Sequence, residues 1–216
     1  MRSVATASDT TGDRRSRTRT ALLTAGQGLF AERPVDAVSV DEIVLAAGVA
    51  KGSFFNHFAD KHQFARAIAA DIRRTFESEV ARINSGERDP VVRLTGGMLM
   101  AVHFALAQRD QTLVMLRTSP LATARDHPLN RGLRLDLAAA SDAGRLREEG
   151  HEASLLFWLG ACNMLMINIT EREFGRVRAA QRLEQMMVLA LTGLGITPDE
   201  ARTHAARRAA QLKAMA

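Results

Sequence analysis

The segment AGVAKGSFFNHFADK, residues 47–61, carries the densest group of side chains with binding chemistry in this chain. Lys51 and Lys61 are cations, and Ser53, Asn56 and His57 are short hydrogen-bonding groups, interleaved with three phenylalanines. The segment does not resemble a reaction centre. The pattern predicts a short helix that aromatic packing holds rigidly while its polar edge contacts a negatively charged partner.

Other groups with catalytic or metal-binding chemistry are dispersed. The six histidines form no i,i+4 pair and have no neighbouring cysteine: His57, His62, His103, His127, His151 and His204. That spacing does not match a zinc site. Cys162 lies in an apolar stretch without a sequence-local activator, which is typical of an inert thiol. We therefore expect no metal, no cofactor and no enzymatic activity.

Composition indicates a folded, helical chain. The 216 residues are 46% hydrophobic, lack tyrosine and carry a net charge of +5, which favours helix and allows an anionic partner. A single cysteine excludes a disulfide framework and fits a reducing cytoplasm. The N-terminus has no secretory h-region, and the apolar run Leu155–Ile169 is too short to cross a bilayer comfortably. We expect a cytoplasmic protein without membrane contact.

Helical periodicity and helix-end signals predict the elements. Ser39 and Glu42 form a capping box at the start of one helix, and Gly48 ends it. The segment NSGERDP, residues 84–90, separates two parts of the chain. The predicted helices cover 17–32, 40–47, about 51–57, 60–83, 90–108, 110–117, 128–143, 152–173 and 178–194, and a last helix opens at Thr197.

The helices on either side of Gly48 have the lengths and the turn of a helix-turn-helix. In that motif the second helix enters the major groove of DNA and the first one holds it there. The predicted small core is Ile43, Val44, Val49, Phe54 and Phe58. The polar edge remains free to face DNA.

The sequence SVDEIVLAAGVAKGSFFNHFADK resembles the N-terminal region of the TetR family of bacterial transcriptional repressors, and the match extends over about 50 residues. The resemblance implies an all-α fold of about nine to ten helices and a homodimer. It divides the chain into a disordered arm (1–13), a three-helix DNA-binding domain (14–83, helix-turn-helix about 39–58) and a ligand-binding and dimerisation domain (84–216). The implied DNA-binding residues are Arg17, Arg19, Ser39, Lys51, Gly52, Ser53, Phe55, Asn56, His57 and Lys61.

This sequence departs from the family pattern at three positions. Ala50 replaces a usual helix-capping Ser or Thr, Phe55 replaces a tyrosine, and Asn56 replaces a second aromatic residue. Three alternatives stay open. The helix-turn-helix could be structural only, His57 could cap a helix instead of contacting phosphate, and the basic run 14–19 could be a solvated tail or a strap across DNA.

The C-terminal part suggests a cavity. Its expected lining is Gly97, His103, Phe104, Phe157, Trp158, Cys162, Asn163 and Met166. His103 and Asn163 would orient a ligand otherwise held by apolar contacts. Because this sequence shows no cluster of charges there, we expect an apolar or amphiphilic effector. The Gly96-Gly97 pair predicts a kink or a close approach of the ligand.

Two late helices are apolar enough for a dimer interface, which the resemblance assigns to Gly160, Ala161, Leu183, Met186, Met187, Ala190 and Leu194. The alternative is that they bury a monomer's core. We expect a regulator, most often a repressor, that binds double-stranded DNA and is released by a small molecule. The rivals are a dimer that has lost operator reading and binds a ligand or a protein, and a helical enzyme or carrier.

Overall fold

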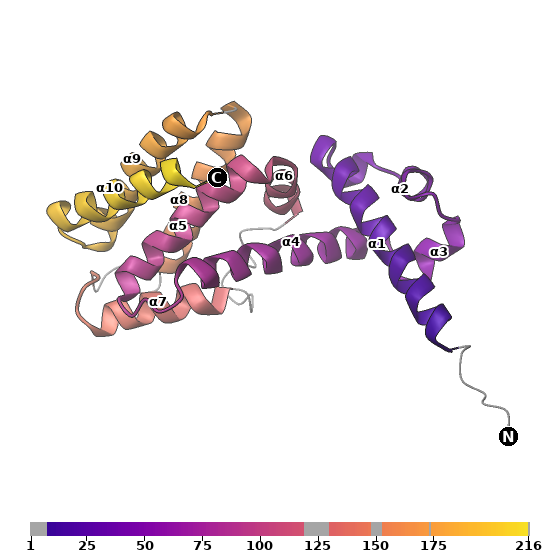
Figure 1. Cartoon of the computed structure of the whole chain (residues 1–216), viewed down its shortest axis with the longest axis horizontal. Helices are drawn as coiled ribbons and strands as arrows, with labels where there is room; N and C mark the ends of the chain where they lie inside the picture. Colours follow the sequence, from indigo (N-terminus) through magenta and orange to yellow (C-terminus); the bar gives the residue numbers. More distant parts are fainter. Residues whose placement is uncertain (1–7, 119–129, 148–152, 173, 216) are drawn as a thin grey trace, which may run out of the picture. The chain divides into compact units, whose positions relative to one another are not determined.

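A computed structural model describes residues 8–118, 130–147, 153–172 and 174–215, with side chains from residue 13 onward. Over these residues the chain forms ten α-helices and one 3-10 helix, and no strand (Figure 1). The predicted all-α fold is confirmed. The chain divides into two compact units, Met1–Asp71 and Ile72–Ala216.

The first unit contains α1 (Ser8–Glu32), a 3-10 turn (Val35–Ala37), α2 (Val40–Ala47), α3 (Lys51–Phe55) and the start of α4 (Lys61–Ile83). The predicted capping box is present, because the Glu42 N–H donates to Ser39 Oγ at 3.2 Å and the Ser39 N–H donates to Glu42 Oε2 at 2.8 Å. Gly48 ends α2 with a φ of +65°, the left-handed conformation that favours glycine.

Phenylalanines form the core of the first unit. The Phe54 ring contacts Phe64 and Phe58 with centroids 5.2 and 5.7 Å apart, and Phe30 contacts Phe64 at 5.9 Å. Gly26 of α1 makes this packing possible, because a Cβ at that position would overlap the Phe64 ring and lie 2.9 Å from Ile68 Cδ1. Full burial of each ring contributes about 1.5–3 kcal/mol, so this cluster fixes α3 on the unit.

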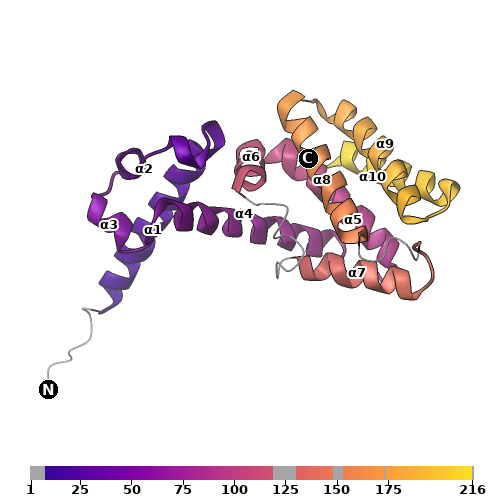
Figure 2. The same ribbon diagram turned by 180° about the vertical axis from the view of Figure 1, so that it is seen from behind.

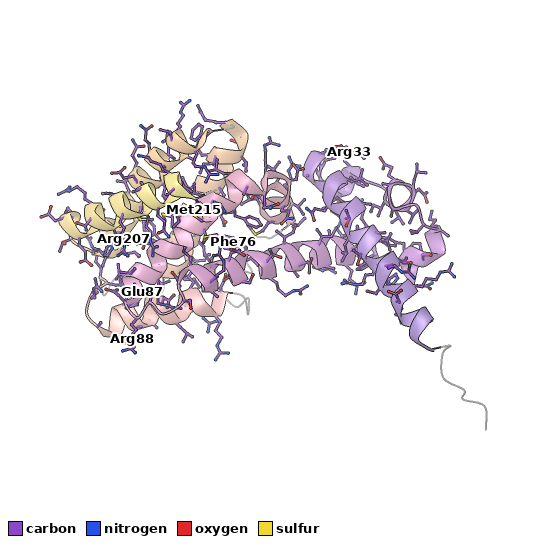
Figure 3. The ribbon with its side chains drawn as sticks, viewed as in Figure 1. Arg33, Phe76, Glu87, Arg88, Arg207 and Met215 are labelled. Atoms are coloured by element: carbon purple, nitrogen blue, oxygen red, sulfur yellow. The ribbon has the colours of Figure 1, made fainter. Side chains whose placement is uncertain are left out.

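Two predicted boundaries differ from those of the structure. The arm expected to be disordered through residue 13 is helical from Ser8, where small polar and acidic residues suit a helix N-terminus. The expected boundary after residue 83 lies beyond the division at Asp71, inside α4. The reason is that α4 contributes to both cores. Phe64 packs in the first unit, and Phe76 packs on Phe104 in the second. Figure 3 labels Phe76 on α4.

The second unit holds the remainder of α4 with α5 (Pro90–Ala107), α6 (Arg109–Thr118), α7 (Arg131–Asp142), α8 (Ser154–Arg172), α9 (Arg176–Leu194) and α10 (Pro198–Ala214). Both ribbon views show α9 and α10 side by side (Figures 1 and 2). Helix α5 packs against α7, α8, α9 and α10, and its side chains are mostly buried. The segment 128–129, expected to begin α7, lies outside the described residues.

Helices α5 and α8 are long and apolar enough to cross a membrane by length and composition alone. The apolar stretches of the two helices are 61% and 44% buried inside the protein. The core helices of a globular helical domain pass the same test, and α5 is such a helix here.

Candidate nucleic-acid interface and ligand cavity

Helices α2 and α3 have the helix-turn-helix arrangement that the sequence predicts. The turn is held by the Gly48 N–H, which donates to Leu45 O at 3.1 Å, and by the Val49 N–H, which donates to Val44 O at 3.0 Å. Phe54 is fully buried and anchors the inner side of α3. The start of α3 at Ala50 has no side-chain cap, as the alanine requires.

The polar edge of α3 faces the N-terminal part of α1 across an open groove of about 440 Å³. Ser53, Asn56 and His57 line one side, and Arg14, Arg15 and Thr18 line the other. The sequence alone does not assign Arg14 and Arg15 to this site, because the basic run 14–19 fits either a solvated tail or a strap across DNA. The i,i+4 spacing of Arg14 and Thr18, with Arg15 beside them, is the helical signal that could have found them.

His57 lies among positive charges. Its pKa is lowered, first by partial burial and then by the guanidinium groups of Arg15 and Arg19. Arg19 lies over the Phe58 ring, with its Cζ 5.6 Å from the centroid. Two arginines beside a histidine that resists protonation form a local site for an anion.

Three predicted phosphate-binding cations have internal partners. Lys51 Nζ lies 2.8 Å from Asp41 Oδ1, and the Arg17 guanidinium lies 2.9 Å from Asp13 Oδ2. Lys61 Nζ donates to the backbone oxygen of Asp36 at 3.1 Å. Exposed ion pairs contribute only about 0–1 kcal/mol, so a phosphate can replace either carboxylate at little cost.

The other predicted DNA-binding residues divide by environment. Gly52 is exposed and a Cβ there would have no described atom within 4 Å, and Phe55 is 52% exposed beside it. The Ser39 hydroxyl, in contrast, is held by Glu42 in the capping box, so its evident role is to begin α2.

The second unit contains a cavity of about 150 Å³ between α4, α5, α7 and α8. Five of the eight predicted lining residues line it: Gly97, Trp158, Cys162, Asn163 and Met166. The remaining three do not. Phe104 packs on Phe76, with ring centroids 5.6 Å apart, and Phe157 packs over Gly193 on the outer side of α8. His103 lies on another side of α5, with its Nδ1 buried and unpaired among the described residues.

The expectation of a cavity without clustered charges is wrong. Arg73 Nε donates to Glu77 Oε1 at 3.0 Å, and a second nitrogen of Arg73 donates to Asn130. Arg93 Nε donates to Asp136 Oδ1 at 2.6 Å. All five residues line the cavity. Arg73 and Glu77 lie on α4, Arg93 on α5 and Asp136 on α7, and Asn130 directly precedes α7. Arg73 and Glu77 are an i,i+4 pair on α4, but Arg73 is 57 residues from Asn130 and Arg93 is 43 residues from Asp136, so no local pattern could reveal the cluster as a whole.

The two adjacent glycines of α5 have different roles: Gly96 allows close helix packing, and Gly97 lines the cavity. Gly96 leaves room for the Asn84 carboxamide and for Arg208, whose Nη2 would lie 3.3 Å from an added Cβ. Arg208 is buried and donates to Thr95 Oγ1 at 3.0 Å. Gly97 faces the cavity. Cys162 is half-buried, and its apolar surroundings raise the pKa of its thiol to about 12, which makes it a poor nucleophile.

Only some of the residues predicted for the dimer interface are exposed to a partner chain. Leu183, Met187, Ala190 and Leu194 are buried within this chain, because they form the side of α9 that packs on neighbouring helices. Gly160, Ala161 and Met186 are partly exposed. The exposed apolar side chains of α8 and α9 are instead Leu156, Phe157, Met164, Val177 and Leu189. Among the described residues, no group of three or more His, Cys, Asp or Glu side chains could hold a metal ion.

Comparison with known proteins agrees with this geometry. The sequence profile of the bacterial regulatory proteins of the tetR family matches residues 22–68. The HTH-type transcriptional repressor AcnR of Corynebacterium efficiens is 28% identical over 145 residues, which cover 64% of this chain and 74% of that protein.

Two crystal structures share the fold. One, from Shewanella sp. PV-4, is assigned to tetR family transcription regulators, with a TM-score of 0.73, 18% identity and coverage of 83% of this chain and 99% of that chain. The other, RolR in complex with resorcinol, has a TM-score of 0.62, 22% identity and coverage of 91% and 96%.

Proposed function

Because this chain belongs to the tetR family of bacterial regulatory proteins, we propose that it is a sequence-specific transcriptional regulator, a repressor that a small molecule releases from an inverted-repeat operator. The groove between α1 and α3 carries this proposal. It combines Ser53 of α3 and the two residues that follow this helix, Asn56 and His57, with two arginines of α1, the composition required to read base edges and hold phosphates. The protein would act in the cytoplasm, without catalysis.

A homodimer with two reading heads fits this function. The exposed apolar residues of α8 and α9 form a face, with Leu156, Met164 and Leu189 each more than half exposed. Exposed apolar side chains on two neighbouring helices are suited to a protein interface. Two DNA-binding domains held together by such an interface would bind half-sites about one turn of the DNA helix apart.

Release by a ligand follows from linkage. A small molecule that prefers a conformation unable to hold the operator weakens DNA binding. By the same factor, DNA weakens the binding of the small molecule to the protein. Helix α4 is suited to couple the two events, because it lines the cavity through Phe76 and Val80 and packs in the first unit through Phe64. The resorcinol complex of RolR supports a small-molecule effector for this fold.

Fluorescence anisotropy tests the proposal. The full chain is titrated into a labelled duplex from its own upstream intergenic region and into a scrambled duplex, at two salt concentrations. Tight binding to the native duplex alone, weakened by salt, is the expected result, because phosphate contacts dominate affinity. Equal weak binding to both duplexes would favour the second candidate, a dimer that has lost operator reading, which the uncapped Ala50 and the exposed Phe55 support.

A further inference from the structure

The cavity of the second unit is sized for one ring. Its volume is about 150 Å³. A volume of about 150 Å³ in an engineered apolar cavity of another protein accommodates benzene. A fatty chain or a multi-ring molecule exceeds this volume, and part of it would have to extend out of the cavity or move the helices apart. The fit therefore favours a ligand with a single six-membered ring or its equivalent.

The wall of the cavity has an apolar part and a polar part. Aromatic and aliphatic side chains from α4, α5, α6 and α8 form the apolar part: Phe76, Val80, Leu94, Met115, Trp158 and Met166. The polar part is formed by Arg73 and Glu77 of α4, Arg93 of α5 and Asp136 of α7. A ligand in this cavity places its ring on the apolar part and its polar substituent on the charged part.

The charged part is balanced. Among the described lining residues it contains two guanidinium groups and two carboxylates, and each arginine already donates to a carboxylate, Arg73 to Glu77 and Arg93 to Asp136. The four side chains are between 14% and 32% exposed. A ligand with a net charge would meet a like charge in this half-buried set and would lose hydration without gaining an unpaired counter-ion.

Glu77 offers a hydrogen-bond acceptor to a ligand in the cavity. Glu77 Oε1 accepts from Arg73, and among the described residues Glu77 has no further hydrogen-bond partner. Burial raises the pKa of Glu77 against the opposing effect of Arg73, so its charged form is poorly solvated. A donor supplied by a ligand would relieve this cost.

We infer that the effector is an uncharged, single-ring molecule that carries at least one hydroxyl or N–H donor, and that Glu77 accepts its hydrogen bond. That this ligand acts as an effector rests on the proposed function. Its binding to the cavity does not depend on DNA binding. Glu77 is in this role a specificity-determining residue for the ligand.

Isothermal titration calorimetry of the full chain with four one-ring probes tests the inference. The probes are phenol, its methyl ether anisole, benzoate and benzylammonium, so that ring size stays constant while donor and charge change. We expect phenol to bind at least tenfold more tightly than each of the other three. Equal affinity for anisole, tighter binding of either ion, or no binding of phenol would each overturn the inference.

Two variants test whether Glu77 is the residue that accepts the hydrogen bond from the ligand. Glu77→Gln keeps the side-chain size but removes the carboxylate, and we expect it to reduce phenol affinity at least tenfold without changing anisole affinity. Glu79→Gln is the matched control, because Glu79 pairs with Arg82 away from the cavity and its loss leaves phenol binding unchanged. Equal phenol affinity in wild type and Glu77→Gln would overturn the assignment of Glu77, and melting temperatures show whether each variant is folded.

The two proposals fail separately. Selective phenol binding by a chain that shows no operator binding would leave this inference standing and the regulator proposal wrong. Operator binding by a chain that prefers a charged or donor-free probe would support the regulator proposal and overturn this inference.

Discussion

Lys51, the first residue of α3, pairs with Asp41 of α2, with Nζ 2.8 Å from Oδ1. Lys51, which we propose to contact a DNA phosphate, is thus held by α2 in the free protein. Both side chains are more than half exposed, so the pair orients Lys51 without binding it tightly.

This pair gives the first prediction. Lys51→Ala should reduce operator affinity similarly for all sequences and lower the slope of log K against log salt by about 1, because one phosphate contact is lost. Asp41→Asn should raise affinity modestly, since it frees Lys51 and removes a negative charge. Anisotropy titrations at several salt concentrations measure both. A Lys51→Ala variant with an unchanged salt slope would show that Lys51 does not contact phosphate.

The arginines of α1 give the second prediction. Arg14→Ala and Arg15→Ala together should weaken DNA binding by about one to two orders of magnitude and lower the salt slope by about 2, because both residues line the groove opposite α3. Arg202→Ala is the matched control, since Arg202 pairs with Asp199 on α10. An equal effect of the control would refute a specific role for the α1 arginines.

The third prediction concerns pH. Burial and the charges of Arg15 and Arg19 lower the pKa of His57 in the free protein, so the neutral form predominates near pH 7. A phosphate beside His57 would raise this pKa again, so DNA binding takes up a proton and affinity should rise as pH falls from 8 to 6. In a His57→Gln variant the part of the pH dependence due to this residue disappears. Identical pH profiles for wild type and variant would contradict phosphate contact at His57.

The fourth prediction concerns stability. Gly26→Ala should destabilise the first unit by about 1–3 kcal/mol, because its Cβ overlaps the Phe64 ring and Ile68. Gly28→Ala, on the same helix with no described atom within 4 Å of the added Cβ, should stabilise it by up to about 1 kcal/mol. Urea unfolding followed by circular dichroism measures both values. Similar effects of the two changes would show that the α1–α4 packing described here is wrong.

The fifth prediction tests the dimer face. Leu189→Arg, at a side chain 66% exposed on α9, should convert a dimer into a folded monomer and weaken operator binding, because a buried arginine without a partner is costly. Leu45→Arg is the control, at an 82% exposed leucine of α2. Analytical ultracentrifugation separates the outcomes. A dimer that survives Leu189→Arg would assign the interface elsewhere.

The helices and their ends could be predicted from the sequence because their causes are local. The Ser39–Glu42 capping box, the left-handed turn at Gly48 and the proline after Thr197 each act within a few residues of themselves. The same reasoning predicted which short helix carries polar groups on its edge. Only the tertiary structure showed that α1 extends to Ser8 and brings Arg14 and Arg15 to that edge.

The sequence by itself therefore determined the helical class, the helix ends and the helix-turn-helix, because each depends on neighbours along the chain. The tertiary structure decided which faces of the helices are buried, as on α9, where Leu183 points inward and Leu189 outward. It also decided the chemistry of the cavity, because Arg73 meets Asn130 and Arg93 meets Asp136 across 57 and 43 residues of sequence. Pairings at such separations arise only when distant helices pack, and no periodicity along the chain records them.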